Sequence, residues 1–212
     1  CRCTKATNMS QMPTAETLER FASVVGPKGV LHAAVDQAPY LKEWRGLWTG
    51  DTPLVLRPQS TAEVSALLKI AYETETAIIP HSGGTGLVGG QIPHGGEVLL
   101  SLDRMTRILE VDATDFTLTT EAGATLKSAQ DAAEAQDRLF PSSLASEGSC
   151  RIGGNLATNA GGLNVLAYGN ARDLCLGLEV VLADGRILST LRKLRKDNTG
   201  YDLKQLFIGS EG

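Results

Sequence analysis

The sequence predicts an α+β fold, and three of its features point that way. Residues 54–80 hold an apolar run, an amphipathic segment and a second apolar run, the order of a β-α-β unit with parallel strands. Residues 98–121 then hold apolar and β-branched runs separated only by short turns, which is typical of successive strands. Asp184-Gly185 lies between two further apolar runs and is a two-residue hairpin signal. Helices and strands therefore interleave without strict alternation, which favours α+β over α/β.

The first part of the chain is expected to form a helical leader segment. Thr14–Val25 has apolar residues at helical spacing, which predicts an amphipathic helix. Residues 36–52 are rich in turn-forming residues and contain both tryptophans, so we expect an ordered connector. The sequence thus divides into a segment of residues 1–52 and a main domain of residues 53–212.

The main domain begins with clear local signals. Leu54–Leu56 is a short apolar strand that ends before a proline. Ser60 and Glu63 have the spacing of a capping box, which opens a helix that reaches about Thr74. Ala77–Pro80 is then predicted as the second strand of the unit.

The remaining elements follow from the same patterns. Residues 125–135 are predicted as a helix, and residues 153–162 as a glycine-rich loop. The predicted strands are Val98–Leu102, Ile108–Val111, Phe116–Glu121, Leu178–Leu182 and Ile187–Ser189.

Composition excludes several classes of protein. With 42% hydrophobic residues, the chain can bury an ordinary core. A net charge of −4 and 5% aromatic residues argue against a nucleic-acid-binding surface. No apolar run approaches the roughly 20 residues of a transmembrane helix. The outlier is glycine, with 23 of 212 residues, against a usual share of about 7%.

The cysteines and the chain ends give two weaker expectations. Cys1 and Cys3 are spaced to hold a metal, but no second pair or histidine completes a site, so no metal and reduced thiols are expected. The chain begins with cysteine and stops just after the apolar run 206–208, so we expect a fragment that lacks a further C-terminal domain.

The most informative glycine cluster follows the second predicted strand. Residues 80–90 read PHSGGTGLVGG, and three of these glycines, with Asp103 further on, imitate a Rossmann dinucleotide fingerprint. Only seven residues separate Gly90 from Val98, too few for a crossover helix of roughly ten residues. The loop therefore runs from strand to strand, and neither a Rossmann turn nor a P-loop fits. Its consecutive amides are expected to bind an anion, with hydroxyl donors from Ser82 and Thr85. A loop that serves tight turns alone is the alternative.

The second cluster, residues 148–162, reads GSCRIGGNLATNAGG and mixes glycine with neutral polar side chains. Such groups can approach a planar heterocycle and bond to its edge. Asn155–Ala160 could form a short helical turn whose amides face a ligand; a capped helix between two turns is the alternative. Two such loops suggest a long ligand with a phosphate end and a ring end.

These two segments together resemble the FAD-binding domain of the vanillyl-alcohol-oxidase, or PCMH-type, flavoenzymes. The final segment, LRKDNTGYDLKQLFIGSEG at residues 194–212, is similar to D-2-hydroxyacid dehydrogenases, particularly the D-2-hydroxyglutarate branch, with glycolate oxidase and D-lactate dehydrogenase as neighbours. The resemblance implies two small α+β subdomains followed by a separate substrate domain. It also implies oxidation of a D-2-hydroxyacid to the 2-oxoacid by hydride transfer to FAD.

The resemblance assigns cofactor contacts residue by residue. The first loop would cradle the pyrophosphate, the second would follow the flavin and ribityl chain, and one later strand would pass the adenine. The implied binding residues are Pro80, His81, Ser82, Gly83, Gly84, Thr85, Gly86, Leu87, Gly148, Ser149, Ile152, Gly153, Gly154, Asn155, Thr158, Asn159, Gly161, Gly162, Glu179 and Val180. Thr85 occupies the place where covalent relatives have a histidine, so non-covalent FAD is expected.

The catalytic groups are expected elsewhere. The resemblance places them, with histidines that can bind a divalent metal, in the C-terminal substrate domain, so no catalytic residue is assigned here. Arg172 and Lys193 are interpreted as surface charges rather than carboxylate clamps. The resemblance implies a small 2-hydroxyacid substrate and a protein or quinone electron acceptor, and it allows a homodimer. Thiols that are expected to be reduced, and the lack of a basic-plus-apolar leader, favour a cytoplasmic location, or the mitochondrial matrix in a eukaryote.

Two other readings remain open from the residues. One is an FAD-binding electron-transfer subunit with no substrate chemistry of its own. The other is a nucleotide-binding module that uses the same loops without a flavin.

Overall fold

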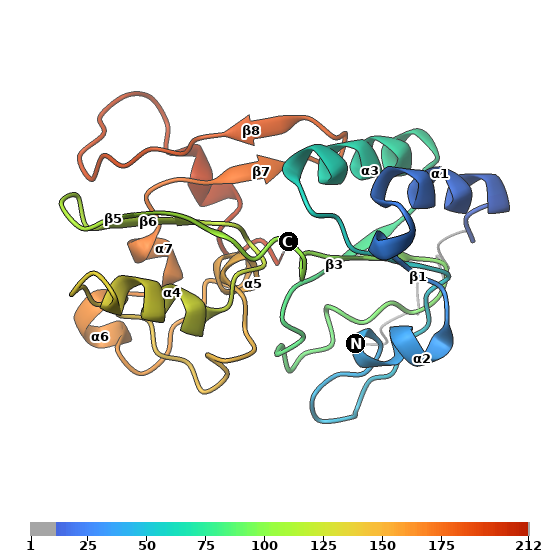
Figure 1. Ribbon diagram of the computed structural model, residues 1–212, viewed down its shortest axis with the longest axis horizontal. Helices are drawn as coiled ribbons and strands as arrows, with labels where there is room; N and C mark the ends of the chain where they lie inside the picture. The colour runs from blue at the N-terminus through green and yellow to red at the C-terminus, as the bar shows by residue number, and fades with distance from the viewer. Residues whose placement is uncertain (1–11, 212) are drawn as a thin grey trace, which may run out of the picture.

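The computed structural model describes residues 12–211. Within that range, a four-stranded sheet has the order β1-β2-β4-β3, and two separate hairpins, β5-β6 and β7-β8, lie beside it (Figure 1). Cys1 and Cys3 lie outside the described residues. The α+β prediction is confirmed, because strands and helices interleave without a regular β-α repeat.

The sheet places three parallel strands side by side. β2 (Val55–Leu56) and β3 (Ile78–His81) each pair in parallel with β4 (Val98–Ser101), which lies between them. The predicted β-α-β unit is therefore confirmed, with one strand inserted between its two strands. β1 (Val30–Leu31), which the sequence analysis does not predict, pairs antiparallel with β2.

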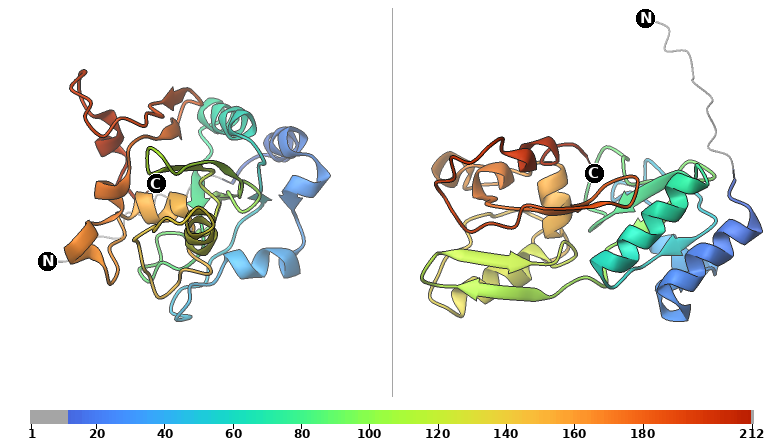
Figure 2. Two further views of the ribbon diagram at one scale, coloured as in Figure 1. Left: turned by 60° about the vertical axis from the view of Figure 1, so that its left-hand side comes forward. Right: turned by 90° about the horizontal axis from the view of Figure 1, so that it is seen from above.

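Two helices cover one face of this sheet and lie side by side (Figures 1 and 2). α1 (Ala15–Val25) starts where the Thr14 hydroxyl accepts a hydrogen bond from the Thr17 amide. It buries Phe21 completely against the sheet. Residues 15–31 thus contribute a helix and a strand to the same core as residues 54–100.

α3 (Thr61–Glu73) follows the predicted capping signal with one difference. The Ser60 hydroxyl accepts from the Glu63 amide at 3.2 Å, as expected. The Glu63 carboxylate, however, accepts from the Gln59 amide at 2.9 Å, one residue earlier than the capping box predicts. The helix buries Leu67 and Ala71 against Leu56 and Val98 of the sheet.

The two hairpins are both antiparallel. β5 (Ile108–Asp112) and β6 (Thr117–Thr120) pair antiparallel with a bulge near Ile108, and α4 (Leu126–Glu134) packs on them. β7 (Glu179–Val181) and β8 (Ile187–Ser189) form the predicted hairpin.

The β7-β8 turn corrects one sequence prediction. Leu182 pairs with Arg186, so the loop contains Ala183, Asp184 and Gly185 instead of two residues. Gly185 alone has a positive φ, 84°, whereas a type I′ turn needs two such residues. The loop is a type I turn closed by a left-handed glycine, and the Ser65 hydroxyl on α3 donates to the Gly185 carbonyl at 2.6 Å.

The second glycine cluster is more helical than expected. α5 (Ile152–Ala157) includes Gly153 and Gly154, which the sequence analysis places in a loop. The other short α-helices in residues 12–211 are α2 (Ala34–Gln37), α6 (Val165–Tyr168) and α7 (Ala171–Leu174). No helix among residues 12–211 is long and apolar enough to cross a membrane.

Candidate cofactor site

The candidate site lies at the carboxyl ends of the three parallel strands. In a parallel sheet these ends meet at one edge, where ligands commonly bind. β2 is followed by Arg57, β3 ends at His81, and Asp103 comes two residues after β4. The strand order alone therefore brings these residues together with the glycine loop that follows β3.

A partly buried polar network forms at the carboxyl ends of these strands. Asp103 accepts from Arg57 Nε at 2.9 Å and from the Tyr40 hydroxyl at 2.6 Å. Burial and the hydrogen bond to Asp103 raise the pKa of Tyr40 to about 12. Asp103 is thus fully engaged by protein groups and supports the sheet edge. This confirms that its Rossmann-like spacing is accidental.

His81 lies within this network at the end of β3. Its ring contacts Tyr40 edge to face at a centroid distance of 5.3 Å, and the residue is 7% exposed. Burial lowers the pKa of His81 below 6.5, so the imidazole is neutral at pH 7. Its Nδ1 is buried without a hydrogen-bond partner among the described residues.

The first glycine loop has the open backbone that anion binding requires. Within residues 12–211, none of the backbone amides from Gly83 to Gly90 donates a hydrogen bond to a protein group. No helix interrupts the path from β3 to β4, as predicted. Gly84 has a positive φ of 66°, and Gly83 packs against the Ser149 carbonyl so closely that a Cβ would lie 2.4 Å from its oxygen.

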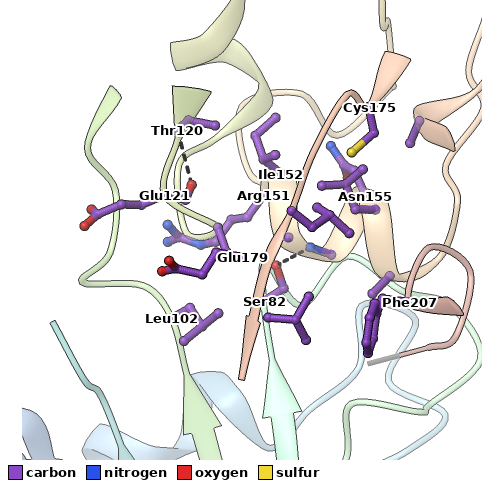
Figure 3. A pocket seen from close by; sticks show the side chains of 18 of the residues that line it. Ser82, Leu102, Thr120, Glu121, Arg151, Ile152, Asn155, Cys175, Glu179 and Phe207 are labelled. Atoms are coloured by element: carbon purple, nitrogen blue, oxygen red, sulfur yellow. Dashed lines mark hydrogen bonds between the residues drawn. The ribbon is translucent and has the colours of Figure 1, made fainter. Parts of the chain in front are cut away.

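The start of α5 contacts this loop directly. The Gly154 amide donates to Ser82 Oγ at 3.1 Å (dashed in Figure 3). The Ile152 and Gly153 amides donate to the Ala124 and Ala122 carbonyls. The amides at the start of this helix are therefore occupied by protein groups, which is contrary to the idea that they face a ligand.

Most of the residues expected to bind the cofactor line one open cavity of about 2980 Å³. That is several times the roughly 300–1,000 Å³ of a drug-sized pocket, so it has room for a long ligand. The lining includes Pro80, His81, Ser82, Gly83, Gly84, Thr85, Gly86, Leu87, Ile152, Gly153, Gly154, Asn155, Thr158, Glu179 and Val180.

The other expected residues lie outside the lining of this cavity. They are Gly148, Ser149, Asn159, Gly161 and Gly162. The Asn159 side chain accepts from the Arg172 amide at 3.0 Å. A Cβ on Gly162 would lie 2.2 Å from the Ser143 carbonyl oxygen, so this glycine allows close packing of two loops.

The polar side chains of the second cluster are partly used within the protein. Asn155 is buried and donates to Cys150 Sγ at 3.6 Å, and the Thr158 hydroxyl donates to the Gly154 carbonyl at 2.9 Å. The Glu179 carboxylate accepts from the Thr61 hydroxyl at 2.8 Å, which joins β7 to α3.

The structure also reveals groups that the sequence analysis misses. Arg151, just before α5, lines the cavity, and its Nε is buried without a partner among the described residues. The carboxyl-terminal segment returns to the same place, because the Gly209 and Glu211 amides donate to α5 carbonyls and Phe207 lines the cavity. These contacts join segments that are far apart in the sequence, so no local sequence pattern predicts them.

The surface-charge interpretation of two basic residues agrees with their contacts. Lys193 forms ion pairs with Glu110 and Asp112. Arg172 donates to the Ile208 carbonyl and the Gln205 side chain, which fixes the last segment of the chain. Within residues 12–211, no group of three or more His, Cys, Asp or Glu residues could hold a metal.

Comparison with known proteins adds a family and a fold. Residues 52–191 match a family model described as "FAD binding domain". A probable mitochondrial D-2-hydroxyglutarate dehydrogenase of Oryza sativa subsp. indica is 45% identical over 198 residues, covering 93% of this chain and 35% of the rice protein. The Danio rerio mitochondrial D-2-hydroxyglutarate dehydrogenase is 48% identical over 170 residues, covering 80% of this chain and 32% of that protein.

Solved structures agree on the fold. An alkyldihydroxyacetonephosphate synthase superposes with a TM-score of 0.83 at 22% identity, covering 97% of this chain and 39% of the other. A p-cresol methylhydroxylase superposes with a TM-score of 0.78 at 23% identity, covering 91% of this chain and 40% of the other. The chain therefore spans little more than a third of the proteins it resembles.

Proposed function

Because this chain belongs to the FAD binding domain family, we propose that it is the cofactor-binding part of an FAD-dependent D-2-hydroxyacid dehydrogenase. The observation that supports this most is the row of unpaired amides from Gly83 to Gly90, at the carboxyl ends of parallel strands and in a cavity with enough volume for a dinucleotide.

The residues present fit FAD at both of its ends. The free amides of the first loop, with the Ser82 and Thr85 hydroxyls, suit a pyrophosphate. Ser82 Oγ accepts from Gly154, so its own proton remains free to donate to a phosphate oxygen. The cavity continues along α5 and β7, whose apolar side chains suit a ring system.

In this proposal the chain's work is to hold and orient the cofactor. FAD supplies the hydride acceptor for oxidation of the hydroxyacid carbon. The sheet edge fixes the first loop through the Tyr40, Arg57 and Asp103 network, and α5 fixes it through Ser82. Neutral His81 adds no charge to the pyrophosphate end.

We further propose that FAD is held without a covalent bond. Thr85 is not a group that attaches a flavin, and His81 is turned into the protein against Tyr40. Acid precipitation should then release the flavin into solution.

The substrate, acceptor and location belong to the longer protein and are proposals. The names of the relatives favour D-2-hydroxyglutarate, with D-lactate as the second candidate. Electrons would pass to a protein or quinone acceptor. Several relatives are named mitochondrial, which favours the matrix over the cytoplasm for a eukaryotic source.

The test begins with the absorption spectrum of the purified 212-residue chain after incubation with FAD and gel filtration. Flavin bands that co-elute with the protein, and that move to the supernatant on acid precipitation, support non-covalent FAD binding. A colourless protein that is folded by circular dichroism contradicts the proposal. For the reaction, the full-length gene product is assayed with D- and L-2-hydroxyglutarate and a redox dye. Reduction of the dye with the D enantiomer alone is expected.

A further inference from the structure

Arg151 lies where the two glycine segments meet. It is the residue that precedes α5, and its extended backbone, with φ −120° and ψ 150°, directs the chain into the helix. Three residues later, Gly154 bonds to Ser82 at the end of β3. Arg151 lines the same cavity as the first loop, and Figure 3 shows its side chain extending there from the start of α5.

The guanidinium of Arg151 is fixed but not neutralised. Nη1 donates to the Gly123 carbonyl, which anchors the group. Nε is buried and has no partner, and within residues 12–211 no carboxylate lies within ion-pairing distance. A partly buried cation without a counter-charge is costly unless something else binds it.

Several other charges that line the cavity have protein partners. Arg107 pairs with Glu121 at 2.7 Å, and Lys193 pairs with Glu110 at 2.5 Å. The Glu179 carboxylate accepts from Thr61. These three carboxylates are therefore bonded to other groups and do not pair with Arg151, which lines the same cavity.

The first loop itself brings no positive charge to an anion. Residues 80–91 contain no lysine or arginine. The charge of Arg151 nevertheless reaches this loop: burial lowers the pKa of His81 most, and the neighbouring Arg151 lowers it further. A cation from the second segment thus acts on the end of β3.

We propose that Arg151 binds the pyrophosphate of the cofactor and neutralises part of its charge, as the cationic partner of the uncharged amide loop. This rests on the proposed FAD function and adds a residue that the glycine motifs do not include. A planar guanidinium suits phosphate oxygens because it offers parallel N–H donors.

The experiment compares Arg151→Met with Arg195→Met, which removes an exposed cation lining the same cavity. Binding of three probes, FAD, ADP and riboflavin, is titrated by fluorescence or calorimetry. ADP has the diphosphate without the flavin, and riboflavin has the flavin ring without phosphate. Arg151→Met is expected to lower the affinity for FAD and ADP by about tenfold or more and to leave the affinity for riboflavin unchanged. Arg195→Met should leave all three unchanged.

A conservative variant distinguishes the effect of the charge on binding from an effect on folding. Arg151→Lys should recover part of the ADP affinity, because it keeps the charge but loses the planar fork. Thermal unfolding of each variant without ligand shows whether the fold persists. A further readout is the salt dependence of ADP binding, which should be weaker in Arg151→Met than in the wild type.

The outcomes distinguish the inference from the function on which it rests. Wild-type protein that binds neither FAD nor ADP overturns the proposed function. Wild-type protein that binds both, with Arg151→Met equally tight, overturns only the role of Arg151. Equal weakening of riboflavin and ADP in a folded Arg151→Met also overturns it, since the effect would not depend on phosphate.

Discussion

The Gly154 amide donates a hydrogen bond to Ser82 Oγ across 3.1 Å, and this bond joins the first turn of α5 to the end of β3. The two residues are 72 positions apart in the sequence. The bond fixes the relative position of the two glycine segments, which together form one cavity wall.

Replacing Ser82 should weaken this junction. Ser82→Ala removes the acceptor for Gly154 and a hydroxyl that faces the cavity, so the free energy of unfolding should fall by about 1 kcal/mol. FAD affinity should fall about fivefold for a loss of similar size. Urea unfolding and flavin fluorescence measure the two effects. Ser23→Ala, whose hydroxyl bonds only within α1, is the control, and equal behaviour of the two variants would sink the prediction.

A methyl group at Gly154 should push the two segments apart. Its Cβ would lie 2.7 Å from Ser82 Oγ and 2.9 Å from Ser82 Cβ, so Gly154→Ala should cost roughly 1–3 kcal/mol of stability. Gly148→Ala is the matched control because no atom lies within 4 Å of its Cβ. Denaturant midpoints that do not differ between the two variants would contradict the close contact.

A substitution at Gly86 tests most directly whether the first loop binds a ligand. Gly84 has a positive φ, so any side chain there strains the backbone whether or not a ligand binds. At Gly86, a new Cβ would meet only the end of the flexible Gln91 side chain, at 3.1 Å.

Gly86→Val should therefore fold normally and lose FAD affinity by about tenfold or more, because the side chain would obstruct the amides. Equilibrium dialysis with FAD and a thermal melt of the free protein separate the two effects. Gly148→Val, at a position outside the cavity lining, should bind FAD normally. Unchanged FAD affinity in Gly86→Val would favour the alternative in which the loop serves turns alone.

His81 should make stability depend on pH. Its pKa is below 6.5 in the folded protein because it is buried, so the unfolded chain binds more protons at mildly acidic pH. The free energy of unfolding should then fall as the pH drops through about 6.5 and level off below the folded-state pKa.

Urea unfolding at about pH 7.5 and about pH 5.5 measures this. His81→Gln should lose less stability than the wild type over the same interval, whatever its stability at the higher pH. Identical losses would mean that His81 is not shielded from solvent as the structure has it.

Local sequence signals predicted the regular elements well where one segment supplies the whole signal. The cap at Ser60 starts its helix as expected, because the hydroxyl and the amide that it caps are three residues apart. The predicted length of the hairpin loop at Gly185 was wrong by one residue. Only the backbone angle of Asp184 separates the two turn types, and Asp-Gly is compatible with both.

The sequence by itself determined the α+β class, the strand-to-strand course of the first glycine loop and the exclusion of a Rossmann turn. Each depends on spacing along the chain, which no partner segment can change. Tertiary structure alone decided which groups face the cavity. It placed β4 between β2 and β3, bonded Asp103 to Tyr40 and Arg57, occupied the first amides of α5 and left Arg151 without a carboxylate. These are contacts between distant segments, and their energies depend on which groups the fold brings within a few ångströms of each other.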